Sequence, residues 1–245
     1  MQRHFIVFAG AAAFFIPLLL IADRRGLIPQ LALGAATAAF LWLFARGSNE
    51  ASRIGAAILI ATTGEVLLSL GWGLYSYRNA LIPLYVPFGH GVFYALAAES
   101  ARQPALCRLE RRITRGVLVA GSLIAAVGFA AFNDQWGLVW WIAAAVCVMR
   151  SRNQLLLSMA FIATMLLEWL GTSIGNWHWT AQVPFVGLHS ANPPSGVGLL
   201  YVLLDTVTIA VCSPSVLRRA AGSRGVLASG AAPFLDQNLD LARNS

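Results

Sequence analysis

Residues 5–22 read FIVFAGAAAFFIPLLLIA, an apolar run that no charged side chain interrupts. A helix needs about 20 such residues to cross a hydrocarbon layer of roughly 30 Å. Similar runs recur along the whole chain of 245 residues, of which 58% are hydrophobic and only 11% are charged. The sequence therefore predicts an integral membrane protein rather than a soluble domain.

The spacing of these runs predicts an all-α fold, a polytopic membrane helical bundle with about eight transmembrane helices. The expected spans are residues 5–22, 27–45, 54–75, 81–98, 116–132, 135–149, 154–174 and 196–213. Residues 214–245 turn polar and small, which is typical of a flexible tail without a core to bury. We expect this tail to lie on the cytoplasmic side.

All 17 basic residues are arginines, and they lie at the ends of the apolar runs. Eight spans would place three of them, Arg24, Arg25 and Arg78, on one side of the membrane and the other fourteen on the side of the amino terminus. Because arginines favour cytoplasmic loops, both termini are expected in the cytoplasm, with the chain crossing the inner (plasma) membrane. The same placement argues against nucleic-acid binding, since no basic stripe lies on a soluble element.

A pattern of the form PxGxGxxY occurs twice, as PFGHGVFY over residues 87–94 and as PSGVGLLY over residues 194–201. Upstream, Glu65 and Glu168 are each followed by a glycine and then by two aromatic residues two positions apart. The matched elements fall in spans three and four and in spans seven and eight. This predicts a 4+4 parallel internal repeat, with halves at residues 1–115 and 116–213. A plain structural interpretation of PxGxGxxY is a helix start packed against a neighbour.

Three carboxyl side chains, those of Glu65, Glu168 and Asp205, fall within apolar spans. A charged group there is costly, so such residues usually face a cavity or a partner and serve a function. We expect them to be catalytic acids. The residues expected to bind substrate beside them are His90, Tyr94, Tyr201, Trp72, Trp169 and Asn192.

Some of these residues also fit simpler structural roles. His90 also fits a hydrogen-bonded packing histidine, and most outer aromatic residues, including Trp177 and Trp179, fit anchors at the membrane surface. The sequence has no HExxH, Walker loop, GxSxG or paired CxxC motif, so we expect no metal site and no cofactor. The three cysteines likewise predict no disulfide.

Residues 168–179 follow the pattern Glu168-x-x-Gly171-Thr172-x-x-Gly175-x-Trp177-x-Trp179. This segment resembles the ExxGTxxG segment of the membrane carotenoid hydratases, and the duplicated helical layout resembles the integral-membrane lycopene cyclases. The likeness covers about a sixth of the chain. It departs from the hydratase pattern in lacking Pro-Phe-Gly between that glycine and the aromatic residues. The resemblance implies that Glu168 acts as an acid.

The sequence thus favours an enzyme that acts on a hydrophobic isoprenoid, a carotenoid or terpenoid, by carboxylic-acid protonation. The reaction would be of the cyclase or hydratase type. Its partners would be membrane lipid and a hydrophobic small-molecule substrate. Two other classes stay open, namely a transporter of a small molecule or lipid and a noncatalytic membrane scaffold. The sequence does not indicate an oligomeric state.

Overall fold

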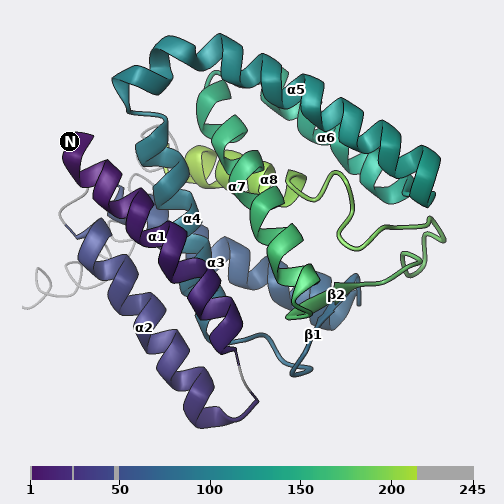
Figure 1. Ribbon diagram of the computed structural model, residues 1–245, viewed down its shortest axis with the longest axis horizontal. Coiled ribbons are helices and arrows are strands. Elements are labelled where there is room, and N and C mark those ends of the chain that lie inside the picture. Colours follow the sequence, from purple (N-terminus) through teal and green to yellow (C-terminus); the bar gives the residue numbers. More distant parts are fainter. Residues whose placement is uncertain (1, 24, 47–49, 214–245) are drawn as a thin grey trace, which may run out of the picture. The chain divides into compact units, whose positions relative to one another are not determined.

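The computed structural model of the chain describes residues 2–23, 25–46 and 50–213, and these residues are mostly helical (Figure 1). The helices are α1 (Gln2–Ala22), α2 (Leu27–Ala45), α3 (Ala51–Glu65) continued by the π-helical η1 (Val66–Gly71), α4 (Tyr85–Ser100), α5 (Pro104–Phe132), α6 (Gln135–Arg150), α7 (Gln154–Ser173) and α8 (Leu199–Val211). Contacts divide the chain into two compact units, residues 1–208 and 209–245. Arg24 and the expected tail, residues 214–245, lie outside the described residues.

Five stretches of the described chain are long and apolar enough to cross a membrane. They are Arg3–Ala22, Leu27–Ala45, Ala51–Gly71, Pro104–Phe132 and Gln154–Ser173. Large hydrophobic side chains on these helices are exposed, among them Phe14 at 76% and Ile28 at 81%. Such a surface needs lipid around it, so the chain is a membrane protein. Helices α4, α6 and α8 are shorter than these five.

Several helix boundaries differ from those that the sequence predicts. The span expected at 54–75 ends at Gly71, because Gly73 adopts a left-handed φ of 75° and turns the chain out of the helix. The span expected at 116–132 belongs to a longer helix that starts at Pro104, where proline at the first helical position costs no hydrogen bond. The expected division between halves at residue 115 therefore falls inside α5, whereas the turn before α5 lies at residues 101–103.

The two PxGxGxxY copies have different local structures. The first copy, residues 87–94, lies wholly inside α4. The second copy begins with a turn over residues 194–198, and only its last residues enter α8. The first copy begins in the first turn of α4, and the second leads into the start of α8, so both copies lie at helix starts.

Two short strands, β1 (Tyr75–Tyr77) and β2 (Trp177–Trp179), form an antiparallel pair that an all-α expectation leaves out. Ser76 lies opposite His178 at the centre of the pair, and these two side chains are exposed while their neighbours are buried. Each strand follows a glycine with a left-handed backbone, Gly73 or Gly175, with φ of 75° and 73°. The glycines let each helix end turn back into a strand.

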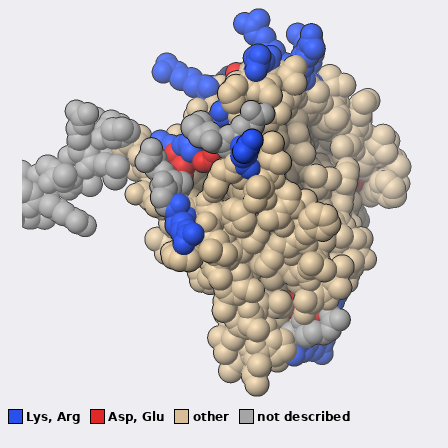
Figure 2. Space-filling view, turned by 60° about the vertical axis from the view of Figure 1, so that its left-hand side comes forward, with Lys and Arg blue, Asp and Glu red and all other residues tan. Residues whose placement is uncertain are grey.

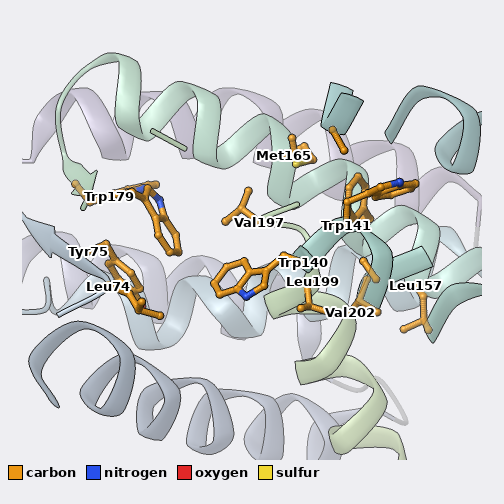
Figure 3. Packing of buried hydrophobic residues seen from close by; sticks show 14 of the residues in the cluster. Leu74, Tyr75, Trp140, Trp141, Leu157, Met165, Trp179, Val197, Leu199 and Val202 are labelled. Carbon is orange, nitrogen blue, oxygen red and sulfur yellow. The ribbon is translucent and has the colours of Figure 1, made fainter. Parts of the chain in front are cut away.

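The strand pair closes one end of the hydrophobic core. Figure 3 shows Tyr75 and Trp179 facing one another there, and Trp140 approaches from the core side. The ring centroids of Tyr75 and Trp179 are 4.5 Å apart, and Trp140 meets Trp179 edge to face at 5.7 Å. Such contacts fix the ring orientations. Since strand side chains alternate between faces, Tyr75, Tyr77, Trp177 and Trp179 all point inward.

Candidate functional site

The carboxylate of Glu65 is held by the two inward side chains of β1. Tyr75 donates its phenolic hydrogen to Oε2 of Glu65 at 2.8 Å, and Tyr77 donates to the same oxygen at 2.7 Å. Burial, and then the charge of Glu65, raises the pKa of both phenols well above the ordinary value. The two tyrosines therefore stay protonated and remain hydrogen-bond donors.

The carboxylate of Glu168 is held in the same way by β2. Trp177 and Trp179 donate their indole N–H groups to Oε2 of Glu168, at 2.8 and 3.0 Å. Gly171, one helical turn after Glu168, makes room for this arrangement, because a Cβ there would lie 2.1 Å from the Trp177 ring. The two acids thus each accept two hydrogen bonds on one oxygen, from phenols in one case and from indoles in the other.

His90 joins the Glu65 group from α4. Its Nε2 lies 3.1 Å from Oε1 of Glu65, and both side chains are about 10% exposed or less. Its other nitrogen, Nδ1, is buried and has no hydrogen-bond partner among the described residues. The imidazole also lies against the ring of Tyr201, with centroids 5.2 Å apart. The carboxylate orients the ring, as it does in many acid–base pairs.

Both acids line one cavity of about 290 Å³, together with His90 and Tyr201. Most of the remaining wall is apolar and comes from α1, α3, α4, α7 and α8. Two lining residues of α8, Leu203 and Val207, are also 41% and 42% exposed. The cavity wall therefore reaches the outer, lipid-facing surface of the helices at this point.

The hydrogen bonds decide which oxygen of Glu168 can carry a proton. Because Oε2 accepts from two N–H groups, it acts as the acceptor oxygen. Oε1 makes no hydrogen bond with any described residue, and the side chain lies in the cavity wall. A proton on Glu168 would accordingly sit on Oε1, the oxygen that is available to a ligand.

The third expected acid, Asp205, is not part of the cavity wall. It is 1% exposed, and neither carboxyl oxygen has a hydrogen-bond partner among the described residues. Tyr94, which was expected beside it in the site, donates instead to Oε2 of Glu50 at 3.1 Å. The structure thus brings together two of the three expected acids.

Three other expected binding residues also lie outside the cavity wall. Trp72 donates its indole N–H to the Pro184 carbonyl at 2.9 Å, and Trp169 is 46% exposed on the surface. Asn192 accepts the backbone N–H of Trp179 at 2.9 Å. Asn192 therefore fixes the position of β2 rather than lining the site.

Four aromatic residues that line the cavity and donate hydrogen bonds to the two acids were not expected as site residues: Tyr75, Tyr77, Trp177 and Trp179. The interpretation of Trp177 and Trp179 as surface anchors is wrong, since they are only 7% and 2% exposed and bind Glu168. A signal for them exists in the sequence. Aromatic residues two positions apart after a glycine fit a strand, in which alternate side chains share one face.

A second polar cluster lies where α3 begins, away from the cavity. Glu50 is 4% exposed and accepts hydrogen bonds from Arg53, Arg102 and Tyr94. Burial by itself would raise the pKa of Glu50, but the hydrogen bond from Arg53 and the positive charge of Arg102 outweigh it and lower that pKa. The cluster joins the start of α3 to the end of α4, and no element of the sequence pattern indicated it.

The described residues contain no group of three or more His, Cys, Asp or Glu side chains placed to hold a metal ion. Their chemistry at the cavity is that of two carboxyls, one imidazole and several aromatic faces. In comparisons with known proteins, no protein family, curated protein or solved structure matches this chain.

Proposed function

We propose that the chain is an integral membrane enzyme in which a carboxylic acid protonates a hydrophobic substrate of the isoprenoid class, with a cyclase or hydratase outcome. One observation carries the proposal. Glu168 offers Oε1 to an apolar cavity while two indoles occupy its Oε2, and the pair of Glu65 and His90 lines the same cavity. A general acid and a general base thus share one site.

The proposed reaction begins at a carbon–carbon double bond of the substrate. Oε1 of Glu168 gives its proton to one alkene carbon, and the neighbouring carbon becomes a cation. The aromatic faces of the wall stabilise this positive charge. A second double bond of the substrate, or a water molecule, then attacks the cation. The pair of Glu65 and His90 takes up the proton released in the last step, and transfer back to Glu168 regenerates the acid.

The nature of the wall supports a substrate that is dissolved in the membrane. The cavity is mostly apolar, and Leu203 and Val207 connect its wall to the lipid-facing surface. A long hydrocarbon could therefore enter sideways from the bilayer, with only its reacting double bond near Glu168. A water-soluble substrate would find few polar groups along this wall.

We further propose that all eight helices cross the inner membrane and that both termini are cytoplasmic. Figure 2 supports this arrangement. On the face that it shows, most arginines gather toward the top and a smaller group lies at the lower end, with a broad uncharged surface between the two groups. Arg25 and Arg78 belong together, since Arg25 donates to the Arg78 carbonyl at 3.2 Å. Both are expected on the outer side.

The 4+4 repeat is part of this proposal, with the boundary moved to residues 101–103. Its support is local. Antiparallel pairing about Ser76 and His178 relates the two strands by a two-fold axis, and each strand binds the acid of its own half. A parallel repeat has its two-fold axis along the membrane normal, so equivalent elements of the two halves lie on the same side of the membrane. The two paired strands fit this requirement, because they lie together at one end of the bundle.

Product analysis in a host that makes acyclic isoprenoids tests the function. Lipid extracts from cells with and without the gene would be compared by mass spectrometry. We expect a product of unchanged mass for ring closure, or one heavier by one water for hydration. Glu168→Gln removes the transferable proton and should lower conversion by about 100-fold or more.

The matched control is Glu99→Gln, which alters a carboxyl paired with Arg102 outside the cavity wall and should leave conversion unchanged. Asp205→Asn should also keep most activity, because Asp205 does not line the cavity. Full conversion by Glu168→Gln would exclude acid catalysis at this residue. An unchanged compound that is merely redistributed across the membrane would favour transport instead.

A further inference from the structure

Four arginines form a single stripe along the first turns of α5. Arg108, Arg111, Arg112 and Arg115 are spaced three, four and seven residues from the first, which places them on one helical face. Val119 and Leu123 continue the same stripe at four-residue steps, and they are 56% and 63% exposed. The stripe is thus cationic at one end and apolar along the rest.

The opposite face of α5 packs into the bundle. Its buried residues are Thr114, Val117, Gly121, Ala125 and Gly128. These positions lie about half a turn around the helix from the arginine stripe. Thr114 accepts a hydrogen bond from Ser158 of α7, and Gly121 lies against Trp141 of α6. The stripe is therefore turned away from the protein and toward the membrane.

No acid among the described residues pairs with the arginines of the stripe. Arg111, Arg112 and Arg115 make no hydrogen bond or ion pair with any described residue. By contrast, Arg53 and Arg102 pair with Glu50, and Arg78 binds the carbonyls of Ile174 and Gly175. The one acid of α5, Glu110, lies on the other side of the helix from Arg112.

These three arginines surround a surface hollow of about 380 Å³, which Gly116 and Val119 also line. Gly116 has open space where a Cβ would lie. An anionic group can approach the helix closely at this point, and the exposed apolar side chain of Val119 lies three residues, about 4.5 Å, further along. The hollow is therefore basic where the three arginines line it and apolar where Val119 lines it.

We propose that this stripe is a binding site for an anionic phospholipid. The phosphate would sit in the hollow between Arg111, Arg112 and Arg115, and an acyl chain would lie along Val119 and Leu123. Guanidinium groups bind phosphate oxygens in a bidentate manner. A zwitterionic headgroup also carries a cation, which the three arginines would repel, so the site should prefer a lipid with a net negative charge. The site is separate from the acid cavity and does not depend on the proposed reaction.

Native mass spectrometry of the detergent-purified full chain, titrated with phosphatidylglycerol, tests the proposal. The triple variant Arg111→Gln, Arg112→Gln, Arg115→Gln should bind this lipid roughly 100-fold more weakly than the natural chain. The control is Arg150→Gln with Arg152→Gln, which removes two exposed arginines at the end of α6, outside the stripe, and should leave binding within about twofold. An equal loss in both would show general charge attraction and would overturn the proposal.

A second variant examines the acyl-chain part while the arginines stay in place. Val119→Asn replaces the exposed apolar contact by a polar side chain without adding a charge, and it should also weaken phosphatidylglycerol binding by about tenfold. Unchanged thermal unfolding would confirm that both variants are folded. Binding of phosphatidylcholine as tight as that of phosphatidylglycerol would contradict the proposed lipid site. Displacement of the lipid by millimolar inorganic phosphate would also contradict it, because the hollow would then be a site for a free anion.

Discussion

Tyr75 and Trp179 lie opposite one another in the strand pair, with ring centroids 4.5 Å apart, yet they donate hydrogen bonds to different acids. Tyr75 binds Glu65 in its own half of the chain, and Trp179 binds Glu168 in the other half. A shift of either strand would therefore disturb both carboxyls. This coupling makes the strand pair the element that positions the proposed acid and base.

The indole donors should matter for activity although they carry no proton to the substrate. Trp177→Phe keeps an aromatic ring but removes the N–H that binds Oε2 of Glu168. We expect the conversion rate to fall roughly tenfold, because the acid loses a fixed orientation. Trp72→Phe removes a similar indole bond, to the Pro184 carbonyl outside the cavity wall, and should change the rate little. Equal effects of the two variants would refute a positioning role.

The glycines before the strands should be intolerant of alanine. Gly73 and Gly175 have φ of 75° and 73°, a region in which a Cβ costs about 1–2 kcal/mol. Gly73→Ala and Gly175→Ala should each lower the free energy of unfolding in detergent by about that amount. Gly55→Ala, inside α3 with open space around the Cβ, should instead be neutral or raise it by about 0.5–1 kcal/mol. Thermal unfolding of the three variants measures the difference.

Much of the helical fold could be predicted from the sequence, because long apolar runs are a direct signal for helices that lie in a membrane. All eight expected spans contain a helix, and two of the three expected acids line the cavity. The strand pair could not be predicted in the same way, because three-residue strands depend on a partner about 100 residues away. Asp205 and Glu168 look alike as isolated carboxyls in apolar runs. Only the packing of α7 and α8 decides which of them faces the cavity.

The Glu50 cluster should make stability dependent on acid pH. The pKa of Glu50 is lowered in the folded chain, so its ionised form stabilises the fold. This contribution is fully present above the unfolded pKa of a glutamate, about 4.3. It is lost as the pH falls below that value and through the lowered folded pKa. Unfolding of Glu50→Gln should therefore depend less on pH below about 5 than unfolding of the natural chain, and parallel curves for the two would contradict this assignment.

The pairing of β1 with β2 also ties together two predictions of membrane topology. Ser76 and His178 are exposed partners at the centre of the strand pair, so they must lie on the same side of the membrane. The native thiol of Cys107 is exposed in α5 next to the arginine stripe, where the charge distribution predicts the cytoplasm. Single cysteines at positions 76 and 178, introduced after replacement of the native ones, should react with a membrane-impermeant maleimide added to intact cells.

Cys107 provides the matched comparison, because as the single remaining cysteine it should react only after the membrane is opened. Labelling of position 76 but not 178 would contradict the strand pair itself. Labelling of Cys107 in intact cells, with both strand positions protected, would reverse the orientation but keep the pairing. Labelling of all three in intact cells would mean an even number of crossings between β1 and the start of α5, so that α4 would not cross the bilayer and the proposed eight-helix arrangement would be wrong. The pattern expected here, with both strand positions outside and Cys107 inside, requires α4 to cross the bilayer despite its length of 16 residues.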